Sequence, residues 1–166
     1  MGHLMMKNSL LVLVLYALSG ITAAFADDAD ERAAVVQMVQ KFFDAMAERD
    51  AEKLRAMLTA DGVLYGYRET PDGLDIIRPT HQSFVDGIGE RESKPIERFW
   101  DPQVLLHDRM AVVWAPYDFY DDGEFSHCGI DNFNLLKTDR GWKITGIVFS
   151  METDDCAASP LGPLRE

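Results

Sequence analysis

The stretch MAVVWAPYDFYDDGEFSHCGIDNFNLLK, residues 110–137, decides the fold, because it predicts two strands joined by a tight turn. Asp122–Gly123 lies between two alternating apolar runs, which is a strong signal of a two-residue β-hairpin. With these two residues at the centre of the turn, Asp121 faces Glu124, and counting outward fixes the other pairs. The register places Asp118 opposite His127 and Trp114 opposite Asp131.

The second strand of this hairpin carries an unusual face. Strict alternation puts a histidine and an aspartate on the same face, between phenylalanines: Phe125, His127, Gly129, Asp131, Phe133 and Leu135. Such a face either meets water or lines a cavity, and we favour the cavity. The other face of the hairpin is apolar enough to favour a partner subunit.

Two helices are predicted before this hairpin. Asp28 or Asp30 can cap a helix that runs to about Glu48, with apolar residues at the spacing of one buried face. Asp50 can cap a shorter helix that ends at Asp61–Gly62.

A strand is then expected at residues 63–67, and a loop rich in turn residues at 68–79. Thr80 can begin a third helix with His81, Phe84 and Ile88 on one face. Residues 96–106, 110–120, 124–137 and 141–152 read as four consecutive antiparallel strands. Helices followed by such a meander predict an α+β fold in which a curled sheet wraps around the helices.

The first 26 residues have the layout of a secretory signal peptide. Lys7 precedes an apolar core from Leu10 to Leu18, and small residues at Ala24 and Ala26 predict cleavage after Ala26. The core is short for a membrane span, although an uncleaved anchor is the alternative. The expected organisation is a signal peptide at 1–26, one domain at 27–154 and a C-terminal tail at 155–166, in an exported protein with no membrane association after cleavage.

The charge and the cysteines limit the partners. A formal net charge of -12 argues against nucleic acid as a partner. Cys128 and Cys156 are expected in a compartment where disulfides persist. A bridge requires the tail to turn back after Glu152, because Cys128 is expected opposite about Met151 or Glu152; the sequence leaves disulfide and free thiols open.

Three segments of the chain resemble the nuclear transport factor 2-like (NTF2-like) superfamily, the SnoaL-like or ketosteroid-isomerase-like cone fold. They are VVQMVQKFFDAMAERDAEKLRAML, DGVLYGY and the run from WAPYDFY through GWKI. Exported members described as lumazine-binding are similar. The resemblance covers about residues 31–152. It implies three helices packed in the concave face of a strongly curved antiparallel sheet, a pocket between them, and a homodimer through the sheet.

Ketosteroid isomerase within this superfamily permits a comparison residue by residue. Its oxyanion-holding acid matches Asp131 in GIDNF, whereas Phe42 stands where it has a tyrosine donor and the general base falls at or near Gly66. Proton shuttling on a steroid needs the base and both donors. Steroid isomerisation by that mechanism is therefore not expected.

The expected function is binding of a small, largely apolar or aromatic organic molecule. Asp131, His127 and Asp118 are the candidate catalytic residues, the acid orienting the imidazole. The candidate ligand-binding residues are Tyr65, Tyr67, His81, Phe84, Trp100, Trp114 and Phe133. The spacings predict no metal site and no cofactor. The alternatives are a lyase or isomerase with His127 or Asp131 as base, and a non-catalytic dimerising interaction module.

Overall fold

A computed structural model describes residues 28–164 of the chain, so the predicted signal peptide and its cleavage site lie outside the described residues. The chain divides into two compact units, residues 1–34 and residues 35–166. In the first unit, residues 28–34 are helical, and Arg32 Nε donates a hydrogen bond to Asp28 Oδ2 at 2.9 Å. The second unit begins with helical residues 35–47 and contains every element that follows.

Two further helices belong to the second unit. Helix α2, Ala51–Met57, is capped by Asp50, whose carboxylate accepts a hydrogen bond from the Lys53 amide. Helix α3, His81–Gly89, is capped by Thr80, which accepts from the Ser83 amide. The caps predicted for both helices are confirmed. The end of α2 was predicted wrongly, because Leu58 already begins a strand.

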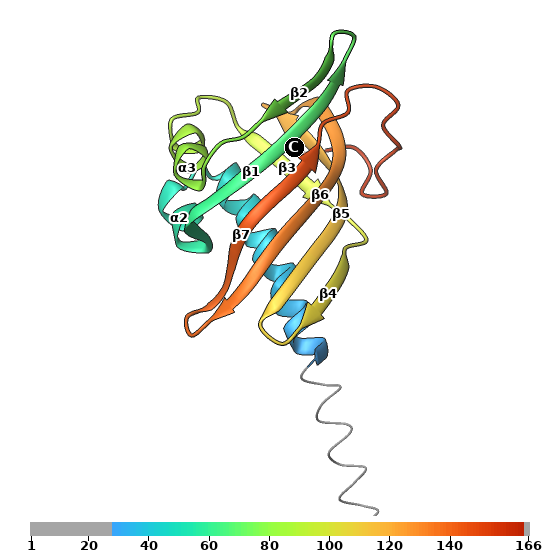
Figure 1. Ribbon diagram of the computed structural model, residues 1–166. Coiled ribbons are helices and arrows are strands. Elements are labelled where there is room, and N and C mark those ends of the chain that lie inside the picture. Colours follow the sequence, from blue (N-terminus) through green and yellow to red (C-terminus); the bar gives the residue numbers. More distant parts are fainter. Residues whose placement is uncertain (1–27, 165–166) are drawn as a thin grey trace, which may run out of the picture. The chain divides into compact units, whose positions relative to one another are not determined.

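The strands form one mostly antiparallel, curved sheet (Figure 1). They are β1 (Leu58–Thr70), β2 (Gly73–Ile77), β3 (Pro95–Phe99), β4 (Gln103–His107), β5 (Met110–Asp121), β6 (Glu124–Thr138) and β7 (Gly141–Ser150). The order across the sheet is β2-β1-β7-β6-β5-β3, with β4 also paired to β5, and β1 and β7 are the parallel pair. The α+β fold predicted from the sequence is confirmed.

The strand predictions needed three corrections. The strand predicted at 63–67 extends over Leu58–Thr70. The loop predicted at 68–79 contains β2, which pairs with β1, but every β2 residue is exposed, so no apolar alternation marked it. The run 96–106 is two strands, because Pro102 lacks an amide for the ladder and Asp101 has a positive φ of 44°.

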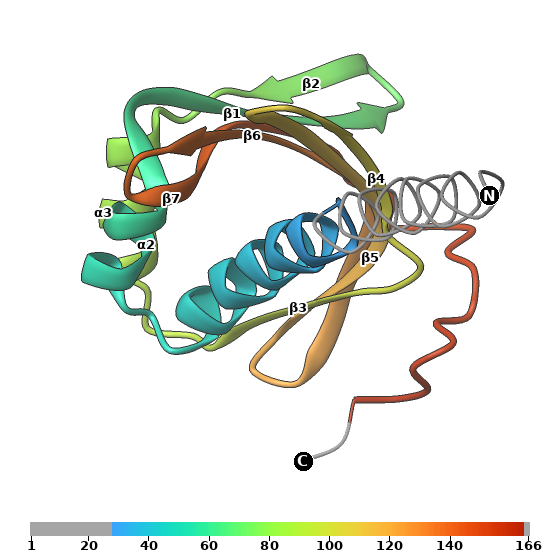
Figure 2. The same ribbon diagram turned by 90° about the horizontal axis from the view of Figure 1, so that it is seen from below.

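Residues 35–47 lie against the concave side of the sheet, as the view in Figure 2 shows. Their apolar side chains meet the inward side chains of the sheet in one core. Its fully buried members include Val35, Val39, Phe42, Leu54, Val113, Phe133 and Ile144. Phe42 and Phe133 of this core also border the cavity described below.

Candidate functional site

A cavity of about 330 Å³ lies on the concave side of the sheet. Its walls are mainly aromatic: Phe42, Phe43, Phe84, Phe119, Phe133 and Phe149. Its polar lining residues are Arg68, Arg91, Glu97, Tyr117, Ser126, His127, Asp131 and Thr153. A concave, largely apolar cavity of this volume with polar groups in its walls is the usual form of a small-molecule site.

The register of the central hairpin determines which side chains face this cavity. The turn is as predicted, with Asp121 opposite Glu124 and Tyr120 opposite Phe125. A β-bulge then leaves Ser126 without a partner in the ladder, so Phe119 pairs with His127. Because side chains alternate along a strand, this one-residue shift changes which face of β5 meets the inward face of β6.

The two cross-strand pairs predicted from the unbulged register are therefore wrong. Asp118 lies opposite Cys128 and Trp114 opposite Asn132, whereas Asp131 lies opposite Ala115. The bulge also separates Phe125, which is exposed, from the inward face. The inward placement of Asp131 and Phe133 is nevertheless as expected, since both are buried and line the cavity.

Asp131 and Glu97 form a pair of carboxyl groups inside the cavity. Asp131 is 3% exposed. Its carboxyl group is hydrogen-bonded to the carboxyl group of Glu97 on β3. The Glu97 residue keeps some accessible surface, but its carboxyl group is enclosed. Asp131 Oδ2 is buried and has no hydrogen-bond partner among the described residues.

Burial raises the pKa of both carboxyl groups. The pKa of Asp131 rises to about 7 because burial disfavours the charged form, and the hydrogen bond from Glu97 opposes this rise. The pKa of Glu97 is raised well above its usual value, first by burial and then by the neighbouring Asp131. The two carboxyl groups therefore titrate together, and burial keeps a proton on the pair up to about neutral pH.

His127 also lines the cavity, but its partners differ from those predicted. Its ring stacks on Phe119, with ring centroids 4.8 Å apart, and Nδ1 lies 3.0 Å from Ser126 Oγ. Burial, and secondarily the positive charge of Arg68, lower the pKa of His127 to about 4. The imidazole is therefore neutral at pH 7, and no carboxylate among residues 28–164 hydrogen-bonds to it.

Asp118 faces away from the cavity and forms an ion pair with Arg98. The guanidinium donates two hydrogen bonds to the carboxylate, at 2.9 and 2.5 Å. Arg98 also donates to the carbonyl oxygen of Gly162 at 3.0 Å, so this pair holds the C-terminal tail. The structure does not bring Asp118 together with His127 and Asp131.

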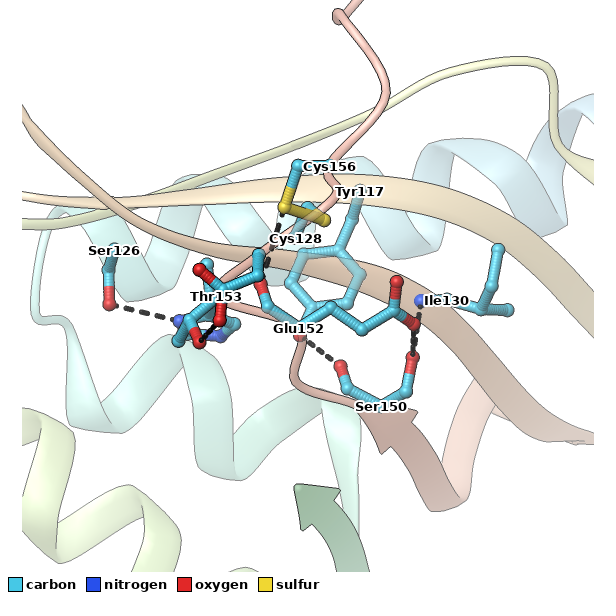
Figure 3. Close-up of a disulfide and its surroundings, with 10 residues drawn as sticks. Tyr117, Ser126, Cys128, Ile130, Ser150, Glu152, Thr153 and Cys156 are labelled. Atoms are coloured by element: carbon cyan, nitrogen blue, oxygen red, sulfur yellow. Dashed lines mark hydrogen bonds between the residues drawn. A yellow bond between two sulfur atoms is a disulfide. The ribbon is translucent and has the colours of Figure 1, made fainter. Parts of the chain in front are cut away.

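The C-terminal tail is fastened a second time by a disulfide between Cys128 and Cys156 (Figure 3). Cys128 pairs with Glu152 as an isolated bridge, so the predicted position of the cysteine is right and the tail does turn back. Tyr117 of β5 donates a hydrogen bond from Oη to the carbonyl oxygen of Ser150, the last residue of β7, at 2.6 Å. These contacts fix the end of β7 beside the cavity.

Of the seven candidate ligand-binding residues, Phe84 and Phe133 line the cavity. Tyr65, Tyr67 and Trp114 are exposed, and Trp100 is half-buried; none of these four lines the cavity. His81 is buried in a smaller hollow, where Nδ1 lies 2.7 Å from the Thr59 carbonyl oxygen and Gly62 leaves room for the ring. The His81 ring packs closely against Gly62 of β1 and does not line the main cavity.

The residue that sequence reasoning missed is Glu97. Alternation in the run 95–99 places its acid on the same face as Phe99, which packs against Phe43. An acid that alternates with core residues was the available signal. Its partner Asp131 comes from a strand 34 positions away, and the sequence contains nothing that joins the two.

Within residues 28–164, no cluster of His, Cys, Asp and Glu has the arrangement needed to hold a metal ion. None of the described helices combines the length and the apolar character that a membrane crossing requires.

Solved structures similar to this one share its fold. A protein with a cystatin-like fold from Novosphingobium aromaticivorans has a TM-score of 0.64 and 14% identity over 84% of this chain and 93% of its own. One from Cytophaga hutchinsonii has a TM-score of 0.62 and 14% identity, covering 72% and 97%. One from Streptomyces avermitilis, titled a "putative dehydratase", has a TM-score of 0.58 and 18% identity, covering 75% and 97%.

All three are titled NTF2-like, and this protein shares their fold, a curved sheet with helices on its concave side. At these identities the likeness concerns the fold alone. The family model described as "Putative lumazine-binding" matches residues 30–150, and the chain belongs to that family. No curated protein matches the sequence.

Proposed function

We propose that this protein is exported and binds a small, largely apolar or aromatic organic molecule in the cavity on the concave side of its sheet. The observation that carries the proposal is a cavity of about 330 Å³ that combines aromatic walls with the buried carboxyl group of Asp131. Concave, mostly apolar cavities with a small number of placed polar groups are the usual form of small-molecule sites. The family's description suggests lumazine as a first ligand to try.

Native mass spectrometry of the protein from its own host's envelope tests this proposal. We expect a chain that begins at Asp27, after removal of the leader, and an added mass from a bound small molecule. Asp131→Asn is expected to lose that mass. Asp139→Asn is the matched control, because its side chain is 95% exposed in the β6–β7 turn. A protein without added mass, and with no affinity for lumazine or other two-ring aromatics, would contradict the proposal.

A second candidate function is an isomerase in which Asp131 acts as the base. The observation that favours it is the pKa of about 7, which suits a group that must accept and return a proton at neutral pH. Asp131 would take a proton from an acidified C–H and return it to another atom of the same molecule. His127 suits this role less, because its pKa is about 4.

Exchange of deuterium from solvent into a bound carbon acid, followed by NMR, separates this candidate from simple binding. An isomerase loses exchange in Asp131→Asn and retains it in Asp139→Asn. If His127→Ala abolishes exchange while Asp131→Asn keeps it, the assignment of the base is refuted.

We also infer a homodimer through the outer face of the sheet. Trp114, Val148 and Tyr65 lie in one row across β5, β6, β7 and β1, and all three are exposed. Light scattering should report a dimer that Trp114→Glu dissociates and that the tail variant Leu161→Glu leaves intact. A monomer at all concentrations would refute this inference, together with the alternative of a dimerising interaction module.

A further inference from the structure

Two arginines line the cavity, Arg68 of β1 and Arg91 between α3 and β3. The guanidinium carbon of Arg91 lies 6.0 Å from the ring centroid of Phe119, and the Phe119 ring stacks on His127. Arg68 is close enough to His127 for its positive charge to act on the imidazole. The two positive charges therefore gather around one part of the cavity wall.

The strand register places Arg68 away from the buried acid of β6. Gly66 of β1, Phe149 of β7 and Asp131 of β6 lie in one row across the sheet. Arg68 lies two residues beyond this row along β1. His127 lies four residues from Asp131 on the same side of the row, because β6 runs antiparallel to β7. At the usual rise of a strand, the backbone of Arg68 is about 7 Å along the sheet from the row of Asp131.

The charge of Arg91 is compensated, whereas that of Arg68 is not. Arg91 donates hydrogen bonds to Asp121 Oδ2 at 2.5 Å and to Ser93 Oγ at 2.8 Å. No hydrogen bond or ion pair joins Arg68 to any of residues 28–164, although Asp75 of β2 is its partner in the β-ladder. This is unusual in a chain with 28 Asp and Glu against 16 Lys and Arg. The cavity wall thus contains one positive charge without a partner among the described residues.

We propose that Arg68 binds the carboxylate of an aromatic acid whose apolar body enters the cavity. This inference rests on the proposed function, since it names the class of molecule for the same cavity. A guanidinium can hold a carboxylate through two parallel hydrogen bonds, and the aromatic walls supply stacking surfaces for a planar body. One uncompensated positive charge fits a singly charged carboxylate better than a doubly charged phosphate.

Asp131 makes the opposite orientation of such a molecule unfavourable. Its carboxyl group is 3% exposed and is hydrogen-bonded to Glu97, and burial there disfavours the charged form of an acid. A carboxylate beside this pair would add a third acid to an enclosed region. The charged end of the ligand is therefore expected at Arg68, and the ring among the aromatic side chains.

The compounds 2-naphthoate and 2-naphthamide test the inference, because they share a ring and differ in a charged against a neutral polar group. Calorimetric titration of the wild-type protein at pH 6 should give about tenfold tighter binding of naphthoate. At this pH naphthoate is ionised, whereas His127, with a pKa of about 4, is neutral, so the preference depends on an arginine. Raising the salt concentration from about 50 mM to about 300 mM should weaken it.

Substitutions then identify the arginine. Arg68→Gln should remove the preference for naphthoate and leave the affinity for naphthamide unchanged. Arg68→Lys should restore the preference in part, because lysine keeps the charge but lacks the planar pair of donors. Arg140→Gln is the matched control, since Arg140 is exposed in the β6–β7 turn and its loss changes the net charge equally; it should keep the preference.

The outcomes separate the two proposals. If naphthamide binds the wild-type protein as tightly as naphthoate, or if Arg68→Gln keeps the preference, the role of Arg68 is overturned while aromatic binding stands. If neither compound binds, the proposed function fails and this inference fails with it. Arg68 is an exposed residue, so Arg68→Gln should fold, and an unchanged thermal midpoint checks this.

Discussion

Replacing Asp131 by asparagine is expected to stabilise the folded protein at neutral and alkaline pH. Burial raises the pKa of this carboxyl group from 3.8 to about 7, so the folded state holds a proton that the unfolded state releases. When the pKa of an acid is higher in the folded state than in the unfolded state, the free energy of unfolding falls as pH rises from the unfolded-state pKa to the folded-state pKa. The loss begins near pH 4 and is complete above about pH 7.

The magnitude follows from the two pKa values. One pKa unit corresponds to ~1.4 kcal/mol, so a rise from 3.8 to about 7 corresponds to about 4 kcal/mol. Asparagine has nearly the same shape and carries no charge. The variant and the wild type should therefore be similar in stability near pH 4, and the variant should be more stable by up to about 4 kcal/mol at pH 8.

The difference between the two proteins must be measured, because the wild-type curve alone mixes opposite effects. The pKa of His127 is lowered to about 4, and that of His81 is also lowered, both by burial. These groups raise the free energy of unfolding as pH rises toward 6.5, the ordinary pKa of histidine. Both are present in wild type and variant, so their effects cancel in the difference.

Urea unfolding at a series of pH values from 4 to 8, with the disulfide intact, measures this difference. Asp139→Asn serves as the control and should show no growing difference with pH. The reasoning is refuted if Asp131→Asn is less stable than the wild type at pH 8, or if the difference stays constant over the whole range.

Three further predictions concern the framework around the cavity. Cys156→Ser should lower the free energy of unfolding by about 3.5 kcal/mol, since the bridge closes a loop with a sequence separation of 28, and reductant should affect only the wild type. Gly129→Ala should lower the thermal midpoint sharply, because a Cβ there would lie 2.2 Å from a backbone oxygen of β7; Gly87→Ala, in open space on α3, should raise it slightly. Arg98→Leu should cost about 3–5 kcal/mol in urea unfolding, since it leaves the Asp118 carboxylate buried and unpaired, and an unchanged midpoint would contradict this account.

Local chemistry made several parts of the structure predictable. Asp50 and Thr80 cap their helices through their own side chains, and Asp122–Gly123 fits a two-residue turn with positive φ at both positions. Alternation also placed Asp131 and Phe133 correctly on the inward face. Each of these features depends on residues close in sequence, so the pattern contains the cause.

Other features depend on contacts that no local pattern encodes. The bulge at Ser126 shifts the hairpin register by one residue, so Asp118 does not lie opposite His127. Asp118 pairs with Arg98 instead. Whether a bulge forms depends on how the two faces of the hairpin pack in the folded protein, so the hairpin sequence alone does not predict it.

The sequence by itself determined the helix caps, the central hairpin turn and the inward position of Asp131, because propensity, capping and alternation act over a few residues. The tertiary structure decided that Glu97 meets Asp131 and that both side chains line a cavity with aromatic walls. The physical reason is that burial and hydrogen-bond pairing belong to the assembled sheet, in which strands distant along the chain lie side by side.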